Sequence, residues 1–453
     1  MDEEDLGSVS GGRRILRFAL PSMLSMLFIS SYTIVDGLFV ANWLGSDSLA
    51  ALNLTVPAFN ILGAVAFMFS AGGSAFVANL MGRGRREDAA SAFSQMVLTV
   101  FLISLVVAAV ALVFADGIVE LLGADETLKP LALEYWNVLV PFIPIIMMQF
   151  LVMGFLIVLR KPHVALIASV SNGCLNMLLD WAFMDLLRWG MAGASLASGL
   201  GSTTALLIAS TVVFSRRSEL PLRICRIRSS VILPTCTNGA SEMASNLSGA
   251  ITTFLFNIMM MRYVGPDGVS AITVMMYVEF LSLAAILGYS SGVAPIMSYD
   301  HGADDKERMA GLFGFSLRFV MVLSLAVFLL VEVFADQIVG LFVSGNETAT
   351  EMAVFGSRVY AVAFLFMGLN VYASSLFTSL SNGVLSAAIS GVRSLLLLAP
   401  LIVILPMTFG VDAIWFAVPV TEVATFVLTM VALRRNASRY GYAHPYARFG
   451  KTM

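Results

Sequence analysis

The sequence predicts an all-α polytopic membrane protein, and three observations lead to that fold class. Of its 453 residues, 58% are hydrophobic and 12% are charged, about half of the charged fraction that soluble domains carry. Apolar stretches of about 20 residues or more follow one another from Arg14 to Arg434. Lysine and arginine gather at alternate breaks between these stretches, as in proteins that cross a bilayer many times.

The polar breaks divide the chain into twelve expected transmembrane helices. These spans are expected at residues 15–42, 48–80, 89–114, 130–158, 163–187, 191–214, 231–262, 268–299, 309–333, 348–378, 383–408 and 410–433.

The distribution of positive charge predicts the orientation of the chain in the membrane. One side collects 20 of the 26 lysines and arginines: Arg13, Arg14, Arg17, Arg83, Arg85, Arg86, Arg160, Lys161, Arg216, Arg217, Arg223, Arg226, Arg228, Lys306, Arg308, Arg434, Arg435, Arg439, Arg448 and Lys451. By the positive-inside rule this side is cytoplasmic. Both termini are then cytoplasmic, which requires an even number of spans. The acidic start "MDEEDLGSVSGG" lacks the positive region of a signal peptide, so we expect the first span to stay in the protein.

Motifs for enzymatic or metal chemistry are missing from the sequence. The three histidines are far apart, and the chain has no His-Glu-x-x-His, Gly-x-Ser-x-Gly or Walker A pattern. The three cysteines are scattered and indicate neither a disulfide framework nor a metal cluster. We therefore expect a protein that is not an enzyme or an ATP-driven pump, and that has no resident cofactor and no nucleic-acid partner.

An internal repeat organises the chain. "FADGIVELL" at 114–122 and "FADQIVGLF" at 334–342 share six of nine residues at an offset of 220. The offset also relates Gly45 to Gly265, and it becomes 221 at Glu126 and Glu347. The repeat predicts duplication of a six-span unit, with lobes at 1–222 and 223–453 related by a pseudo-two-fold axis along the membrane normal. Such parallel repeats favour secondary transport, in which one lobe moves against the other.

The first candidate functional residue is Asp36, in the apolar run "SSYTIVDGLFVANWLG" at 31–46. It lies ~28 Å along a helix from Arg17, in the outer half of the membrane. An unpaired carboxylate is costly there and usually faces a wet cavity or a partner. The alternative, a cap on a frayed helix end, is disfavoured because the apolar run continues beyond Asp36.

The fifth span supplies a partner in "SNGCLNMLLDWAF" at 171–183. Asn172, Asn176 and Asp180 recur every four residues and share one helical face, and Asp180 reaches nearly the depth of Asp36. Two acids close together cannot both stay ionised without a cation between them. A proton or a sodium ion held by Asp36, Asn176 and Asp180 would neutralise them. A ladder of interhelical hydrogen bonds explains Asn172 alone, but not a second carboxylate.

The sixth span has small residues at Gly193, Ala197 and Gly201, a spacing that lets two helix backbones approach closely. Ser198 could then offer a hydroxyl to the same pocket, although helix packing alone also explains it.

In the second half, the candidate substrate-cavity residues are Glu242, Glu279 and Asn257, and Asn370 and Glu422 are further isolated polar points. Span eleven carries no acid equivalent to Asp180, so coupling is expected in the first lobe. The 26 methionines and 32 phenylalanines suit a cavity for varied apolar ligands, but they also fill helix contacts.

With these residues in view, the sequence resembles the multidrug and toxic compound extrusion (MATE) family over nearly its whole length. The first span has Pro21 before "VDGLFVANWLG", and "LAAL" follows at 49–52. The fifth span is similar to the family pattern Asn-Pro-x-Leu-Asn-x-x-Leu-Asp, with Gly173 in place of proline. The sixth span is similar to Gly-Ala-Ala-x-Ala-Thr, with Ser198 in place of threonine.

The resemblance implies antiport of bulky organic cations against H⁺ or Na⁺ in the cytoplasmic membrane. It places the cation site at Asp36, Asn172, Asn176, Asp180 and Ser198, and we expect a helix bend at Pro21 and a monomer in the lipid bilayer. A flippase for lipid-linked oligosaccharides is the alternative, but its anionic cargo should need several cavity arginines, whereas only Arg318, Arg358 and Arg393 lie at membrane depth. A channel is a further alternative function, but it does not explain the paired acids.

Overall fold

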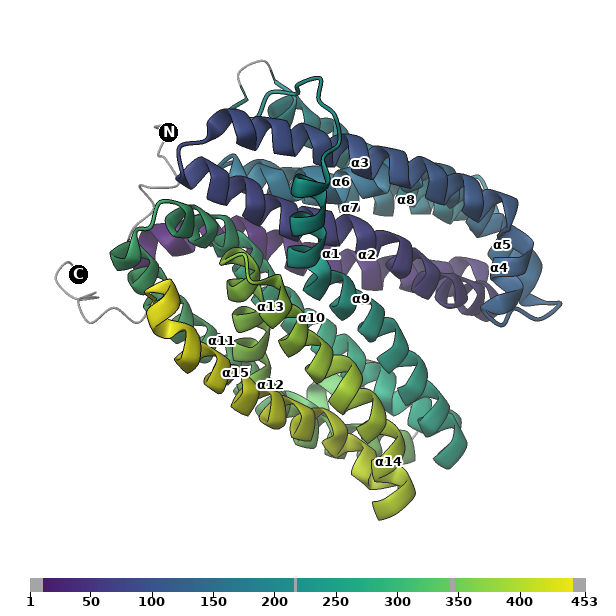
Figure 1. Ribbon diagram of the computed structural model, residues 1–453. Helices are drawn as coiled ribbons and strands as arrows, with labels where there is room; N and C mark the ends of the chain where they lie inside the picture. Colours follow the sequence, from purple (N-terminus) through teal and green to yellow (C-terminus); the bar gives the residue numbers. More distant parts are fainter. Residues whose placement is uncertain (1–10, 216–217, 343–346, 443–453) are drawn as a thin grey trace.

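The computed structural model describes residues 11–215, 218–342 and 347–442 and is almost entirely helical over these ranges (Figure 1). Four of the basic residues used to predict orientation, Arg216, Arg217, Arg448 and Lys451, lie outside the described residues.

The helices form two lobes of six spans each. In the first lobe they are α1 (Gly12–Leu44), α2 (Ser46–Gly82), α3 (Arg86–Val113), α4 (Ala115–Leu121), α5 (Leu128–Leu139), η2 (Val140–Phe142), α6 (Ile143–Val158), α7 (Pro162–Asp180), η3 (Trp181–Leu186) and α8 (Gly190–Val213). In the second lobe they are α9 (Ser229–Tyr263), α10 (Pro266–Gly302), α11 (Lys306–Phe342), α12 (Glu347–Ser379), α13 (Gly383–Gly391), η4 (Val392–Leu398), α14 (Ala399–Phe409), η5 (Val411–Phe416) and α15 (Ala417–Tyr440).

All twelve predicted spans coincide with helical segments, so the predicted fold class is confirmed. Within the described residues, eleven helical stretches are long and apolar enough to cross a membrane. The remaining span is α9, whose apolar character is diluted by polar residues from Asn238 to Ser248. Several spans are assembled from consecutive helices; α5, η2 and α6 together form the fourth, and the change of helix type falls at Pro141.

The two copies of the Phe-Ala-Asp sequence bend the chain in the same way. Phe114 separates α3 from α4 with φ −104° and ψ 20°, and Phe334 interrupts α11 with φ −107° and ψ 19°. Gly45 and Gly265, which form the tight turns after α1 and α9, also match at φ 91° and φ 94°. Equivalent residues therefore adopt equivalent backbone conformations, which supports the duplication.

The lobes pack against each other through α1 with α10 and through α2 with α9. We call the end of the bundle where α1 begins and α15 ends the base. At the base, a Cβ atom on Gly72 would clash with the Thr235 carbonyl oxygen, and one on Gly239 would clash with the Met68 carbonyl oxygen. The backbones of α2 and α9 touch there because neither glycine has a side chain.

A second pair of glycines closes the base where α2 crosses α10. A Cβ atom on Gly82 would clash with the Tyr299 carbonyl oxygen, and one on Gly302 would clash with the Asn79 carbonyl oxygen. These two contacts exchange under the offset of 220. The pseudo-two-fold axis therefore passes between α2 and α10.

Away from the base the same helices separate. A Cβ atom on Gly37 of α1 or on Gly249 of α9 would meet no neighbouring atom within 4 Å. Figure 1 shows the two lobes diverging toward the ends labelled α4 and α14. We call this side of the bundle, where the lobes diverge, the divergent side.

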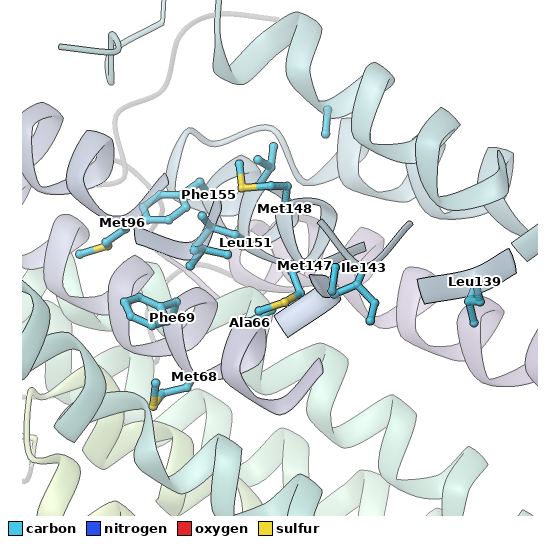
Figure 2. Packing of buried hydrophobic residues seen from close by; sticks show 14 of the residues in the cluster. Ala66, Met68, Phe69, Met96, Leu139, Ile143, Met147, Met148, Leu151 and Phe155 are labelled. Atoms are coloured by element: carbon cyan, nitrogen blue, oxygen red, sulfur yellow. The ribbon is translucent and has the colours of Figure 1, made fainter. Parts of the chain in front are cut away.

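Many methionines belong to the core of the first lobe. Met68, Met96, Met147 and Met148 are buried among aromatic and aliphatic side chains, and Figure 2 shows Met96 and Met148 beside Phe155. Of the two explanations offered for the methionines, these four residues fit the second, because they fill contacts between helices.

Candidate cation-binding site

The predicted first-lobe residues meet where α1, α7 and α8 pack together. Asn172, Asn176 and Asp180 share one face of α7 and are buried. Asp36, half-buried on α1, lies against this face and interacts with Asp180.

Gly173 lets α1 approach α7. A Cβ atom at this position would overlap the rings of Phe28 and Tyr32 on α1. Since Tyr32 precedes Asp36 by about one helical turn, the contact also brings the Asp36 carboxylate to α7. The glycine that replaces the usual proline therefore has a structural role in assembling the group.

Gly201 lets α8 approach α7 from the other side. A Cβ atom there would overlap the amide oxygen of Asn172. Nearby, Asn176 Nδ2 donates a hydrogen bond to Ser198 Oγ at 3.3 Å. The close approach predicted from the small residues of the sixth span is confirmed, and it adds the Ser198 hydroxyl to the polar group.

The two carboxylates have no basic partner in the described part of the chain. Asp36 and Asp180 interact with each other, and no lysine, arginine or histidine contributes to the charge balance of either. Both Asp180 oxygens and Asp36 Oδ1 are buried and accept no hydrogen bond. Like charges in a medium of low dielectric repel strongly, so the pair needs a proton or a metal cation to neutralise it.

Two tyrosines complete the site, and neither was predicted from the sequence. Tyr32 lies beside Asp36 and Asn172, and Tyr135 of α5 lies beside Ser198 and both acids. Ser195 Oγ donates a hydrogen bond of 2.8 Å to the Tyr135 carbonyl oxygen and so ties α5 to α8. The spacing of Tyr32 from Asp36 was a usable signal in the sequence, whereas nothing near Tyr135 pointed to this pocket.

The donor set is suited to a hard cation. Carboxylate, amide and hydroxyl oxygens from Asp36, Asn176, Asp180 and Ser198 are the ligand types that hard metal ions such as sodium prefer. In the described residues no group of three or more histidine, cysteine, aspartate or glutamate side chains could hold a metal ion. The donor types, together with two carboxylates that lack a basic partner among the described residues, suit a proton or a sodium ion.

The three candidate cavity residues of the second lobe have different surroundings. Glu242 follows Gly239 on α9 by about one turn, and its carboxylate has no hydrogen-bonding partner among the described residues. Asn257 is half-buried, and its Oδ1 atom has no partner in the described ranges. Glu279 instead accepts a hydrogen bond from the Tyr360 hydroxyl.

A family model was matched twice by the sequence, at residues 21–182 and 243–404, and its description is MatE. The chain belongs to the MatE family. One match falls in each lobe, as expected for a duplicated six-span unit. The MATE resemblance read from the first, fifth and sixth spans is therefore confirmed.

Curated relatives are distant but cover most of the chain. A FAD transporter of Shewanella oneidensis is 23% identical over 432 residues, which cover 93% of this chain and 94% of the relative. The multidrug export protein MepA of Staphylococcus aureus is 22% identical over 417 residues, with 90% of each chain covered. The protein is thus a transporter of the MATE family that crosses the membrane many times.

Solved structures show the same fold. A MATE structure in complex with MaL6 has a TM-score of 0.89 at 22% identity and covers 95% of this chain and 98% of its own. An outward-facing multidrug resistance MATE transporter also has a TM-score of 0.89 at 22% identity, covering 95% and 97%.

Proposed function

We propose that this protein is a secondary active exporter that moves bulky organic cations out of the cell in exchange for H⁺ or Na⁺. The observation that carries the proposal is the pair formed by the half-buried Asp36 and the buried Asp180, which lacks a basic partner among the described residues. A site that must be neutralised from outside the protein is a natural place for an ion gradient to act.

The proposal places the protein in the cytoplasmic membrane with the base toward the cytoplasm. The basic residues of the base support this orientation through the positive-inside rule. In this orientation the glycine contacts close the base toward the cytoplasm and the lobes diverge on the outer side, as an outward-facing conformation requires. Asp36 and Asp180 belong to the first lobe, which would bind the coupling cation.

The proposed export follows from competition between conformations. A cation that binds at Asp36 and Asp180 removes the charge that draws this part of α1 toward a wet pocket, so the packing of α1 can shift. Each ligand then favours the conformation in which it binds better, and the gradient of one drives movement of the other. Pro21 lies inside the continuous helix α1, beside Ser22, whose atoms lie close to Gly288 and Gly292 of α10, and we propose that α1 bends there.

Drug efflux from proteoliposomes tests this function. Proton and sodium gradients are imposed separately, and efflux of a fluorescent organic cation is followed with each. Efflux driven by neither gradient would refute the proposal. Efflux driven by one gradient identifies the coupling ion.

The same assay decides between organic cations and anionic cargo. One relative is named a FAD transporter, and FAD carries an anionic pyrophosphate. In this chain Arg393 is largely buried and pairs with Glu422. Arg318 and Arg358 are exposed, and Arg358 pairs with the exposed Asp336. Among these three arginines, no buried one is left to bind such a group. We therefore expect unlabelled FAD not to compete with the cation. Strong competition would favour an anion carrier, including the flippase alternative.

Glu242 is the acid that we assign to the organic cation. Because its carboxylate has no partner on α9, Glu242→Gln should weaken the apparent affinity for a cationic drug roughly tenfold, a loss of ~1.4 kcal/mol of attraction. Affinity is measured as the drug concentration that gives half-maximal efflux. Glu351→Gln, which changes an exposed acid of α12, is the control; an equal effect of both variants would rule out a specific role for Glu242.

The hydrogen bond between Asn176 and Ser198 predicts coupled effects on cation use. Asn176→Ala and Ser198→Ala should each raise the cation concentration needed for half-maximal efflux. The free-energy loss of the double variant should be smaller than the sum of the two single losses by about 0.5–1.5 kcal/mol. Full additivity of the two losses would show that the residues act independently.

A further inference from the structure

The second lobe contains a buried ion pair within the membrane. Arg393 Nε lies 2.5 Å from Glu422 Oε1, and the two side chains are 17% and 2% exposed. Asn370 Nδ2 donates to Glu422 Oε2 at 2.7 Å and to the Glu422 carbonyl oxygen at 3.0 Å. The carboxylate therefore has a cation on one oxygen and an amide on the other.

A second carboxylate lies in the field of the same arginine. Glu279 of α10 accepts a hydrogen bond from the Tyr360 hydroxyl of α12 and interacts electrostatically with both Arg393 and Glu422. Four spans, carrying α10, α12, η4 and α15, thus contribute to one network of two acids and one arginine.

The repeat relates this network to the cation site of the first lobe. At the offset of 221, Arg393 is equivalent to Asn172 and Glu422 is equivalent to Gly201. α7 and α13 also begin at equivalent residues, Pro162 and Gly383, so Asn172 and Arg393 lie at the same depth. Where the first lobe has an amide against a glycine, the second lobe has a guanidinium against a carboxylate.

The two lobes consequently differ in how their acids are neutralised. The first-lobe acids have no basic partner in the described residues, whereas Glu422 has a permanent one, because arginine does not lose its proton in proteins. A buried ion pair is a poor source of stability compared with apolar packing. It is also expensive inside a membrane, where such groups usually serve function.

We propose that Arg393 is a tethered cation that fills the second lobe's counterpart of the first-lobe cation site. The inference rests on the proposed function, because it takes the first-lobe pair as the site of cation exchange. The guanidinium neutralises Glu422 throughout the transport cycle, so no exchangeable cation enters there. Coupling is thereby confined to the first lobe although both lobes descend from one unit.

The test removes the tether and supplies the cation from solution. The Asp36→Asn/Asp180→Asn protein serves as the background, because the amides that replace the two first-lobe acids cannot take up a proton or attract a cation. The melting temperature of this purified background protein at fixed pH should not change with millimolar guanidinium or sodium chloride. Adding Arg393→Ala leaves a cavity and an unpaired acid, and millimolar guanidinium should then raise the melting temperature by roughly 2–4 °C.

Three further variants test whether the response to guanidinium depends on the missing charge at Arg393 and on the Glu422 carboxylate. Arg393→Lys keeps a tethered charge and should show no response to guanidinium. Arg393→Ala with Glu422→Gln removes the acid as well and should show none. Arg358→Ala is the matched control, because this arginine pairs with the exposed Asp336.

Two results would overturn the proposal. One is a folded Arg393→Ala protein that is insensitive to both cations. The other is a cation response in the Asp36→Asn/Asp180→Asn background with Arg393 in place. If Arg393→Ala cannot be purified in buffer, it is purified with millimolar guanidinium; recovery supports a tethered cation, and failure to recover argues against it. Gradient-independent efflux by the wild type would instead refute the proposed function, and the comparison of melting temperatures would still report on Arg393.

Discussion

Replacing Asp36 with asparagine should reduce cation-driven drug efflux to the level of protein-free liposomes, while the yield and the melting temperature of the protein are maintained. The amide preserves the volume of the side chain and its ability to accept a hydrogen bond. It cannot take up a proton, and it contributes no charge to hold a sodium ion. Asp180 would then be the single acid of the site, and the repulsion that makes cation uptake obligatory would be lost.

The control for this variant is Asp116→Asn, the same substitution at an acid of α4 whose side chain is 76% exposed. An exposed ion pair such as the one between Asp116 and Lys129 contributes little, so efflux should remain at the wild-type level. Efflux by Asp36→Asn that still follows the imposed gradient would show that coupling does not depend on Asp36, and Glu242 and Glu279 would become the acids to test.

Much of the fold could be predicted because membrane insertion imposes simple constraints on sequence. Each span needs an apolar stretch of suitable length, and the polar breaks between stretches are visible without a structure. The Phe-Ala-Asp repeat indicated the duplication, and Phe114 and Phe334 have nearly the same dihedral angles. The changes of helix type within spans, such as η3 and η4, left no comparable pattern in the sequence.

The first-lobe site was predictable where its residues follow helical periodicity. Asn172, Asn176 and Asp180 are four residues apart, and Asp36 could be placed by its distance from the charged end of its span. Tyr135 reaches the same pocket only through the packing of α5 on α8. Pairing across spans does not appear in local sequence.

In the second lobe, too, pairing between residues of different spans could not be predicted from the sequence. Arg393 and Glu422 are 29 positions apart in the sequence, and each looked like an isolated polar residue in an apolar span. Glu279 was predicted as a cavity residue for substrate, and its hydrogen bond from Tyr360 could not be seen before the helices were packed. Charge balance inside a bundle depends on which helix faces meet, and that is a property of the tertiary structure.

The other large effect is expected from enlarging the glycines that close the base. Gly72→Val and Gly302→Val would each place side-chain atoms where a backbone carbonyl of the opposite lobe now lies, at Thr235 and Asn79. Overpacking of this kind costs about 1–3 kcal/mol. Since every 1.4 kcal/mol changes an equilibrium about tenfold, the two substitutions together should move most molecules out of the conformation with a closed base, and efflux should fail.

The displacement can be measured directly, because the substitutions act on an equilibrium between conformations and leave each lobe intact. Spin labels at Arg85 and Lys306, which are exposed at the base on opposite lobes, should report a longer distance in Gly72→Val/Gly302→Val than in the protein without these substitutions. Gly314→Val is the matched control, since a Cβ atom at this helical glycine would meet nothing within 4 Å, and it should change neither the distance nor efflux. An unchanged label distance together with lost efflux would contradict the steric argument, because the glycines would then matter for something other than closing the lobes at the base.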